Sequence, residues 1–193
     1  LAGTGTIVFG NTGAGNRIDL DGTGATTFGT GITVRGQNGT IGDQINIGGT
    51  QVLLNQGTIS ADVSGGIISI TESAVTNAGT LEARNGGTLV LNSAVTQTGA
   101  GSILADGGVV QQSSMRVTGG TVDSVGSGVL RVESTAANFL DAVTLNGTLD
   151  MATIGNSRER IVNGLTLNGQ VSLNGNGNLS FDGDNTLAGI ETL

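Results

Sequence analysis

The side chains that could do chemistry in this chain are carboxylates and guanidinium groups. The 193-residue sequence contains 15 Asp and Glu residues and 7 arginines, and it has no lysine, histidine or cysteine. Without histidine and cysteine, serine–histidine and cysteine–histidine pairs are excluded, and so are the usual zinc sites. An enzyme made from these residues would have to work with carboxylates, alone or beside arginine.

The acidic residues do not form the pairs that such an enzyme needs. Hydrolysis of a glycosidic bond uses two carboxyl groups at a defined separation. A lyase that works through calcium-binding aspartates would need a basic residue beside them, and Arg158 and Arg160 have only Glu159 as an acidic neighbour. Most other carboxylates stand singly, as do Glu72, Glu133 and Asp141. We therefore predict no catalytic residue and no cofactor in this chain.

Two segments partly match calcium-binding loops. Residues 19–24, with Asp19 and Asp21, begin like a calcium loop, but Thr30 stands where the bidentate Glu belongs. Residues 181–187, with Asp182 and Asp184, match one copy of a nonapeptide that binds calcium through tandem repetition. One incomplete copy of each pattern is too little for a site, so we predict no metal ligands.

The element that must position all these residues is a repeat of about 22 residues, a period typical of a solenoid. A step of Gly, a small polar residue and an aliphatic residue recurs along the chain, and the longest interval between steps runs from Gly120 to Gly147. The steps begin at Gly39, Gly57, Gly79, Gly101, Gly120, Gly147 and Gly169. We expect residues 136–141, inside the longest interval, to form a protruding loop.

The register of the repeat is clearest where residues 143–151 are compared with residues 165–173. One period apart, apolar residues fall on apolar residues and Asn-Gly falls on Asn-Gly. Because alternate side chains of a strand point to opposite faces, the apolar set can stack inward. The comparison predicts that Val143, Leu145, Leu149 and Met151 stack with Leu165, Leu167, Val171 and Leu173. Leu145→Asp should then unfold or badly destabilise the chain.

The same alternation assigns the carboxylates of the repeat to the outer face. They lie three or five positions after a step glycine, an odd offset that they share with the outward Thr of the step. We interpret Glu82, Asp123, Asp150, Asp62 and Asp106 as solvated, and expect Asp150→Asn to change stability little. Of the four phenylalanines, Phe139 is the one that could lie outside the core, although core packing is the default.

Composition supports a packed, all-β chain. Hydrophobic residues make up 36% and charged residues 11%, which is the opposite of a disordered composition. Gly or Asn interrupts nearly every helical window, and the absence of proline suits strands that must donate each backbone N–H. A net charge of −8 argues against nucleic acid as a partner, and no apolar run is long enough for membrane insertion of this segment.

The repeats also resemble those of a known group of proteins. Residues 3–11, 36–42 and 77–81 carry Gly-Thr-[Ile/Leu] steps with Asn and Gly around them. They resemble the repeats of filamentous-haemagglutinin-like adhesins and autotransporter passengers, and the resemblance extends over nearly the whole chain. It implies a right-handed parallel β-helix on or outside a Gram-negative cell, with roles in attachment and biofilm formation.

We thus expect an all-β, right-handed parallel β-helix (β-solenoid) with turns of about 22 residues. Residues 1–193 would form a single β-solenoid segment, a fragment of a larger secreted or surface-exposed bacterial protein. Its expected work is structural or adhesive, as a stalk or passenger segment. Candidate partners are a host surface or glycan, and other copies that join through open solenoid ends. The alternative is a carbohydrate-active β-helix, a polysaccharide lyase or hydrolase, with catalytic residues partly outside this segment.

Overall fold

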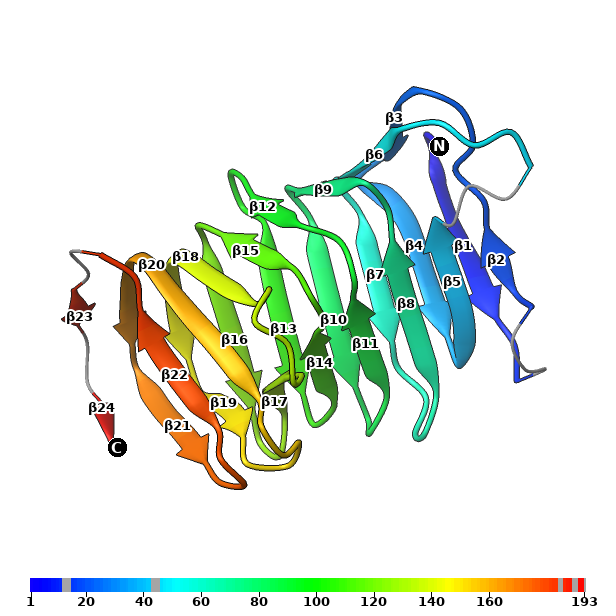
Figure 1. Ribbon diagram of the computed structural model, residues 1–193. Helices are drawn as coiled ribbons and strands as arrows, with labels where there is room; N and C mark the ends of the chain where they lie inside the picture. The colour runs from blue at the N-terminus through cyan, green and yellow to red at the C-terminus, as the bar shows by residue number, and fades with distance from the viewer. Residues whose placement is uncertain (12–14, 43–45, 184–185, 189–190, 193) are drawn as a thin grey trace.

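The computed structural model describes residues 1–11, 15–42, 46–183, 186–188 and 191–192. Within these ranges the chain forms strands and turns and no helix. The strands stack in parallel as a β-solenoid of about seven turns, with successive turns about 22 residues apart. Figure 1 shows the strands side by side along the molecule, with the two termini at opposite ends. The predicted all-β, parallel solenoid is confirmed.

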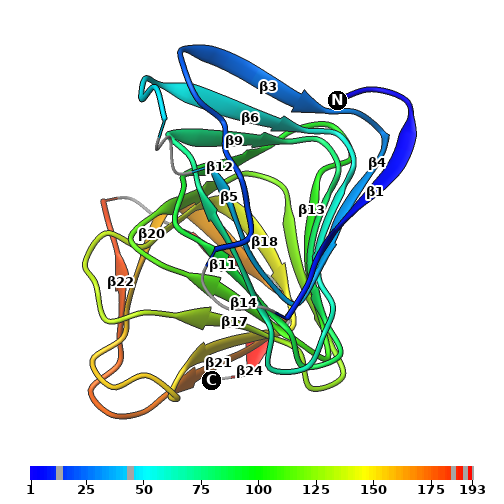
Figure 2. The ribbon, with the colours of Figure 1, turned by 90° about the vertical axis from the view of Figure 1, so that its right-hand side faces the viewer.

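Three walls of parallel strands surround the core, and Figure 2 shows them along the axis of the solenoid. The first wall consists of β1 (Thr4–Phe9), β4 (Gly31–Gly36), β7 (Thr58–Ala61), β10 (Thr80–Arg84), β13 (Ser102–Asp106), β16 (Thr121–Val125), the C-terminal parts of β18 (Phe139–Asn146) and β20 (Arg158–Leu167), and β23 (Leu187–Ala188). The second consists of β2 (Arg17–Ile18), β5 (Asn38–Gly42), β8 (Ile67–Thr71), β11 (Thr88–Leu91), β14 (Val109–Gln112), β17 (Val129–Val132), β19 (Thr148–Met151), β21 (Gly169–Leu173) and β24 (Glu191–Thr192). The third consists of β3 (Gly24–Phe28), β6 (Gln51–Asn55), β9 (Ala74–Asn77), β12 (Val95–Gln97), β15 (Arg116–Thr118), the N-terminal parts of β18 and β20, and β22 (Asn178–Phe181).

The core has the register that the sequence predicts. Val143 pairs with Leu165 and Leu145 with Leu167 on the first wall, and Leu149 pairs with Val171 and Met151 with Leu173 on the second. Seven of these eight side chains are buried. Leu173 is the exception, because 51% of its surface is exposed, so the stack closes less completely in the last turns.

Most step glycines recur because they lie against the backbone of the preceding turn, whereas Gly39, Gly120 and Gly147 lie closest to its side chains. A Cβ atom on Gly79 would lie 2.1 Å from the carbonyl oxygen of Gly57, and one on Gly101 would lie 2.1 Å from that of Asn77. No other residue fits such a close approach of two chains. The glycine repeat in the sequence therefore results from a close contact that recurs between turns.

The steps nevertheless belong to two different walls. Gly57, Gly79, Gly101 and Gly120 precede strands of the first wall, whereas Gly39, Gly147 and Gly169 belong to strands of the second wall or directly precede them. The interval from Gly120 to Gly147 is long because it covers a full turn plus the passage to the next wall.

The expectation of a protruding loop at residues 136–141 is therefore right only for Ala136 and Ala137, which form an exposed turn, and wrong for the rest. Phe139 and the two residues after it belong to β18, where Thr121 of the preceding turn pairs with Thr144. Asn138, just before this strand, is fully buried. From Phe139 onward the residues of the interval thus form wall.

Buried amide side chains support one corner of the solenoid. Asn55, Asn77 and Gln97 follow one another at the ends of β6, β9 and β12, and all three are buried. Asn55 Nδ2 donates to Asn77 Oδ1 over 2.9 Å, and Asn77 Nδ2 donates to the carbonyl oxygen of Ser102 over 3.0 Å. Asn55 Nδ2 also lies 3.3 Å from the carbonyl oxygens of Gly57 and Thr80, so these amides give buried polar groups at the turn hydrogen-bond partners.

Candidate functional site

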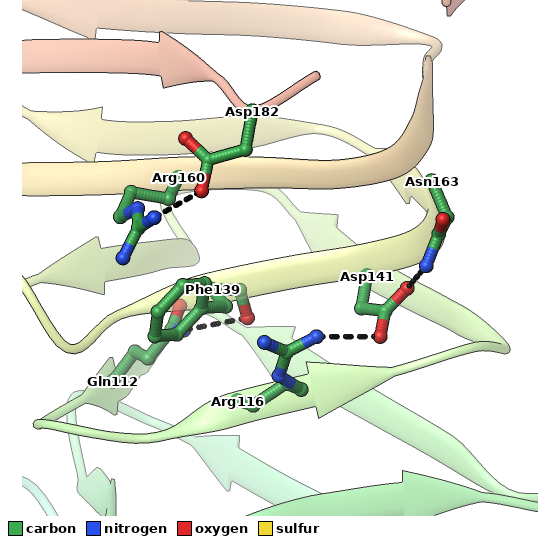
Figure 3. A network of polar contacts seen from close by, with 7 residues as sticks. All are labelled: Gln112, Arg116, Phe139, Asp141, Arg160, Asn163 and Asp182. Carbon is green, nitrogen blue, oxygen red and sulfur yellow. Dashed lines mark hydrogen bonds and ion pairs between the residues drawn. The ribbon is translucent and has the colours of Figure 1, made fainter. Parts of the chain in front are cut away.

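A row of stacked side chains lies on the outer face of the third wall (Figure 3). The strand register pairs Arg116 of β15 with Phe139 of β18, and Phe139 with Arg160 of β20. Paired residues of parallel strands lie ~4.8 Å apart, so the phenyl ring lies between two guanidinium groups. The Cζ atom of each arginine is 4.5 Å from the ring centroid. We name these three residues the Arg–Phe–Arg stack.

Each arginine of the stack is also paired with a carboxylate. Arg116 Nη1 is 2.8 Å from Asp141 Oδ2, and Arg160 pairs with Asp182. Asp141 accepts a second hydrogen bond, from Asn163 Nδ2 over 2.7 Å. Partial burial raises the pKa of Asp141, but the hydrogen bonds from Asn163 and Arg116 and the charge of Arg116 outweigh it. The pKa of Asp141 is therefore lowered, and this carboxyl stays ionised at neutral pH.

The corner between the third and first walls sets the position of the Asp141–Asn163 pair. The register of β18 and β20 shifts between Asp141 and Val143. Ala142 and Asn163 both have left-handed backbone, with φ of 53° and 55°. Asparagine tolerates this conformation well because its short side chain bonds locally. A hollow of about 270 Å³ follows this corner and is lined by residues 142–144, 163–166, 186 and 188.

Glu159 lies between Arg158 and Arg160 in the sequence but on the opposite side of the wall. Alternation in β20 turns its side chain into the solenoid, where it is fully buried. No described residue gives either carboxylate oxygen a hydrogen bond of good geometry.

Burial controls the ionisation of this carboxyl. It raises the pKa of Glu159 well above its usual range, although the backbone N–H groups of Arg160 and Leu140 and the side chain of Gln112 lie near enough to offset part of the effect. Glu159 therefore holds its proton in conditions where exposed carboxylates have lost theirs.

Gln112 and Asn138 surround Glu159 in this polar part of the interior. Gln112 Nε2 donates to the carbonyl oxygens of Met115 and Phe139, over 3.0 and 3.1 Å. Asn138 Nδ2 donates to the carbonyl oxygens of Glu133 and Arg158, over 3.1 and 3.2 Å. Both side chains are fully buried, so the two amides connect the backbone of neighbouring turns from the inside.

The interpretation of the outward carboxylates as solvated needs correction for three of them. The side chains of Asp62 and Glu82 are only 11% and 13% exposed. Asp150 is buried: its Oδ2 lies 2.9 Å from Arg131 Nε, and its Oδ1 accepts the backbone N–H groups of Ala152 and Thr153. Burial raises the pKa of Asp150, and the bonds from Arg131, Thr153 and Ala152 lower it by more, so the net shift is downward.

The other outward carboxylates also have partners on the solenoid surface. Asp62 pairs with Arg35, and Asp106 and Glu82 pair with Arg84. Asp123 accepts a hydrogen bond from Asn146 Nδ2 over 2.8 Å. The outward assignment holds for them, and each is tied to a neighbour.

The calcium-like segments have other local contacts. Asp21 Oδ1 accepts backbone N–H groups of Asn46, Ile47 and Gly48 over 3.1–3.3 Å, and Asp19 Oδ2 accepts Asn46 Nδ2. Asp182 pairs with Arg160, whereas Asp184 of the second motif lies outside the described residues. Across the part of the chain that the structure describes, no three acidic side chains lie close enough to share a metal ion.

The Arg–Phe–Arg stack limits what this face can do. The two arginines come from the turns before and after Phe139, so they cover both faces of the ring. A sugar ring would need one of those faces free in order to stack on it. The carboxyl with the raised pKa, Glu159, is on the inner side of the wall, and Asp141 on the outer face is ionised.

The interpretation of this region from the sequence was partly right. Phe139 lies outside the buried core and within a strand, so the default of core packing is wrong for it, and Phe181 is also outside the core, 43% exposed. Arg160 belongs to the stack, and Arg158 lies apart from it. The stack itself was missed, although Arg116, Phe139 and Arg160 follow one another at close to the period of the repeat.

No protein-family model, no curated protein and no solved structure matches this chain. Within the described ranges no helix could cross a membrane. The resemblance of the repeats to those of adhesins and autotransporter passengers thus rests on the repeat style and on the β-solenoid that it predicts.

Proposed function

We propose that this chain is a structural or adhesive segment, a stiff stalk or passenger region of a secreted or surface-exposed bacterial protein. The observation that carries the proposal is the continuous parallel stack, in which each described turn pairs with the next through parallel strand ladders. A stack of this kind has no hinge along its length, and its stability comes from contacts between neighbouring turns. It is suited to hold other surfaces at a distance.

The ion pairs support the same role because they bridge consecutive turns. Arg35 and Asp62 are 27 residues apart, Arg131 and Asp150 are 19 apart, and Arg116 and Asp141 are 25 apart. Each pair joins neighbouring turns of the stack. The charged residues of the outer face thus reinforce the rod.

The carbohydrate-active alternative finds less support. Two carboxylates and two arginines do meet around Phe139, which is the arrangement that could favour an enzyme. However, each of these carboxylates is paired with an arginine, and the pKa of Asp141 is lowered. A general acid for glycoside cleavage needs a raised pKa in a position that the substrate can reach.

Removal of one turn tests the scaffold proposal. Deletion of residues 80–101 joins Gly79 to Ser102 and preserves the register, because Thr80 pairs with Ser102 in the stack. In the full-length protein on its producing cell, we expect this variant to be displayed and to support attachment. The purified segment should be folded and ~4.8 Å shorter by small-angle scattering.

The control is a variant that lacks residues 80–90, which is half a turn. This variant should unfold, because residues of its strands would face turn residues of the neighbouring repeat. Loss of attachment by a folded one-turn deletion would contradict a spacer role. Release of unsaturated or reducing sugar ends from polysaccharides by the intact protein would favour the enzyme alternative.

The scaffold proposal includes association of solenoid ends. β1 and β3 are end strands of their walls in the described part of the chain, and in the strand ladder each pairs with a neighbour on one side only. We expect the scattering mass of the isolated segment to rise with concentration. A constant monomer mass up to millimolar concentration would exclude this mode of assembly.

A further inference from the structure

One arginine departs from the pattern of ion pairs. Among the described residues, five arginines contact carboxylates, namely Arg35, Arg84, Arg116, Arg131 and Arg160. Arg17 also makes contacts. Arg158, the first residue of β20, is exposed, and its guanidinium has no hydrogen bond or ion pair with any part of the chain that the structure describes.

Arg158 borders a polar hollow at the corner between the second and third walls. The hollow has a volume of about 420 Å³ and is lined by Arg158 and three asparagines, Asn156, Asn176 and Asn178. No carboxylate and no aromatic ring is among the lining residues. One cation and three amides thus face the same space.

The backbone holds these four residues in place. Asn156 and Asn176 have left-handed backbone, with φ of 58° and 66°, and Asn156 N donates to the carbonyl oxygen of Gly175 over 2.7 Å. Arg158 pairs with Asn178 in the ladder between β20 and β22. A site whose backbone is already fixed loses less entropy when it binds a ligand.

The acidic residues near Arg158 are engaged elsewhere. Asp182 pairs with Arg160. Glu133, whose carbonyl oxygen accepts the N–H of Arg158, uses its carboxylate for Gln111 and Ser113. Glu159 faces the interior and is buried. The charge of Arg158 is therefore left for a ligand from outside.

We propose that the hollow at Arg158 binds the carboxylate of an acidic sugar unit of the hexuronate type. A guanidinium presents two parallel N–H groups that match a carboxylate. The three amides offer donors and acceptors that suit sugar hydroxyl groups. The volume is within the range of small-ligand sites, and the net charge of −8 opposes long, densely charged polyanions.

This binding site goes beyond the scaffold role and does not depend on it, so either could fail alone. The test is titration of the ¹⁵N-labelled chain with D-glucuronate, followed through the Arg158 Nε–H and Asn side-chain NH₂ signals. Because the hollow is open and polar, we expect a Kd on the order of 1–10 mM. D-glucose and acetate, which carry only the hydroxyl groups or only the carboxylate, should each bind at least tenfold more weakly.

Two variants make the test specific. Arg158→Gln should raise the Kd for D-glucuronate at least tenfold, with an unchanged circular dichroism spectrum because the side chain is exposed. Arg84→Gln removes the same charge from the first wall and should change the Kd less than twofold. Unchanged binding by Arg158→Gln, equal loss in both variants, or acetate binding as well as D-glucuronate would each overturn the proposal.

Discussion

The buried carboxyl of Glu159 should make the chain lose stability as the pH rises. In the folded chain this group is fully buried and its pKa is raised well above 4.5, whereas in the unfolded chain it returns to the ordinary value. Between the two pKa values the folded state binds one proton that the unfolded state has released. The contribution of Glu159 is therefore complete below pH 4.5 and is lost as the pH rises toward the folded pKa.

The size of the effect follows from a single proton. One proton held only by the folded state changes the free energy of unfolding by about 1.4 kcal/mol per pH unit across that window. Glu159→Gln keeps the shape of the side chain and cannot ionise, so this variant should lack the slope. For a domain of this size, the wild-type Tm should fall relative to that of the variant by about 3–6 °C per pH unit.

Thermal unfolding by calorimetry from pH 4 to pH 8 would measure the difference. Glu133→Gln, which removes a carboxylate from outside the core, is the control and should keep the wild-type slope. Lowered pKa values at Asp21, Asp141 and Asp150 add slopes of the opposite sign below pH 4, but they are common to both chains and cancel. Parallel wild-type and Glu159→Gln curves would refute the argument.

Three further predictions concern the core and the outer face. Leu145→Asp should lower the free energy of unfolding by more than about 4 kcal/mol, since it buries an unpaired carboxylate in place of a fully buried leucine; an unmoved urea midpoint would contradict the register. Asp150→Asn should lower the free energy of unfolding by about 1–2 kcal/mol at pH 7, because it removes the ion pair with Arg131. Since the pKa of Asp150 is lowered, this loss should shrink as the pH falls below 3.8. A difference between the two chains that stays constant with pH would contradict the prediction. Phe139→Ala and Arg116→Gln should couple by about 0.5–1 kcal/mol in a double-mutant cycle of urea unfolding, whereas strict additivity would show that the ring contact contributes nothing.

Much of the fold was predictable from the sequence because the repeat reports a backbone contact. A glycine that lies against the previous turn must return in each turn, as Gly79 and Gly101 do. Apolar residues one period apart must also meet in the core, as Leu145 and Leu167 do. Because these constraints act between neighbouring turns, they appear in the sequence as residues that recur at the period of the repeat.

The sequence did not show which wall each step belongs to. Gly120 and Gly147 stand before the same kind of residues, but the first enters a first-wall strand and the second enters a second-wall strand. Both positions need a glycine for close approach, so the local pattern is the same. The predicted loop at residues 136–141 is limited to the turn at Ala136 and Ala137, because the long interval comes from the change of wall and not from an insertion.

The chemistry of a residue in this chain depends on the turns above and below it more than on its sequence neighbours. Arg158, Glu159 and Arg160 look like one charged cluster in the sequence, yet the wall separates the glutamate from both arginines. Arg160 instead finds Asp182 in the following turn and Phe139 in the preceding one. In a solenoid, a search for catalytic motifs among adjacent residues therefore does not find the side chains that meet in space. Positions one turn apart should be compared instead. On the outer face of the third wall, this comparison shows arginines paired with carboxylates, and it leaves Arg158 as the cation available to a ligand.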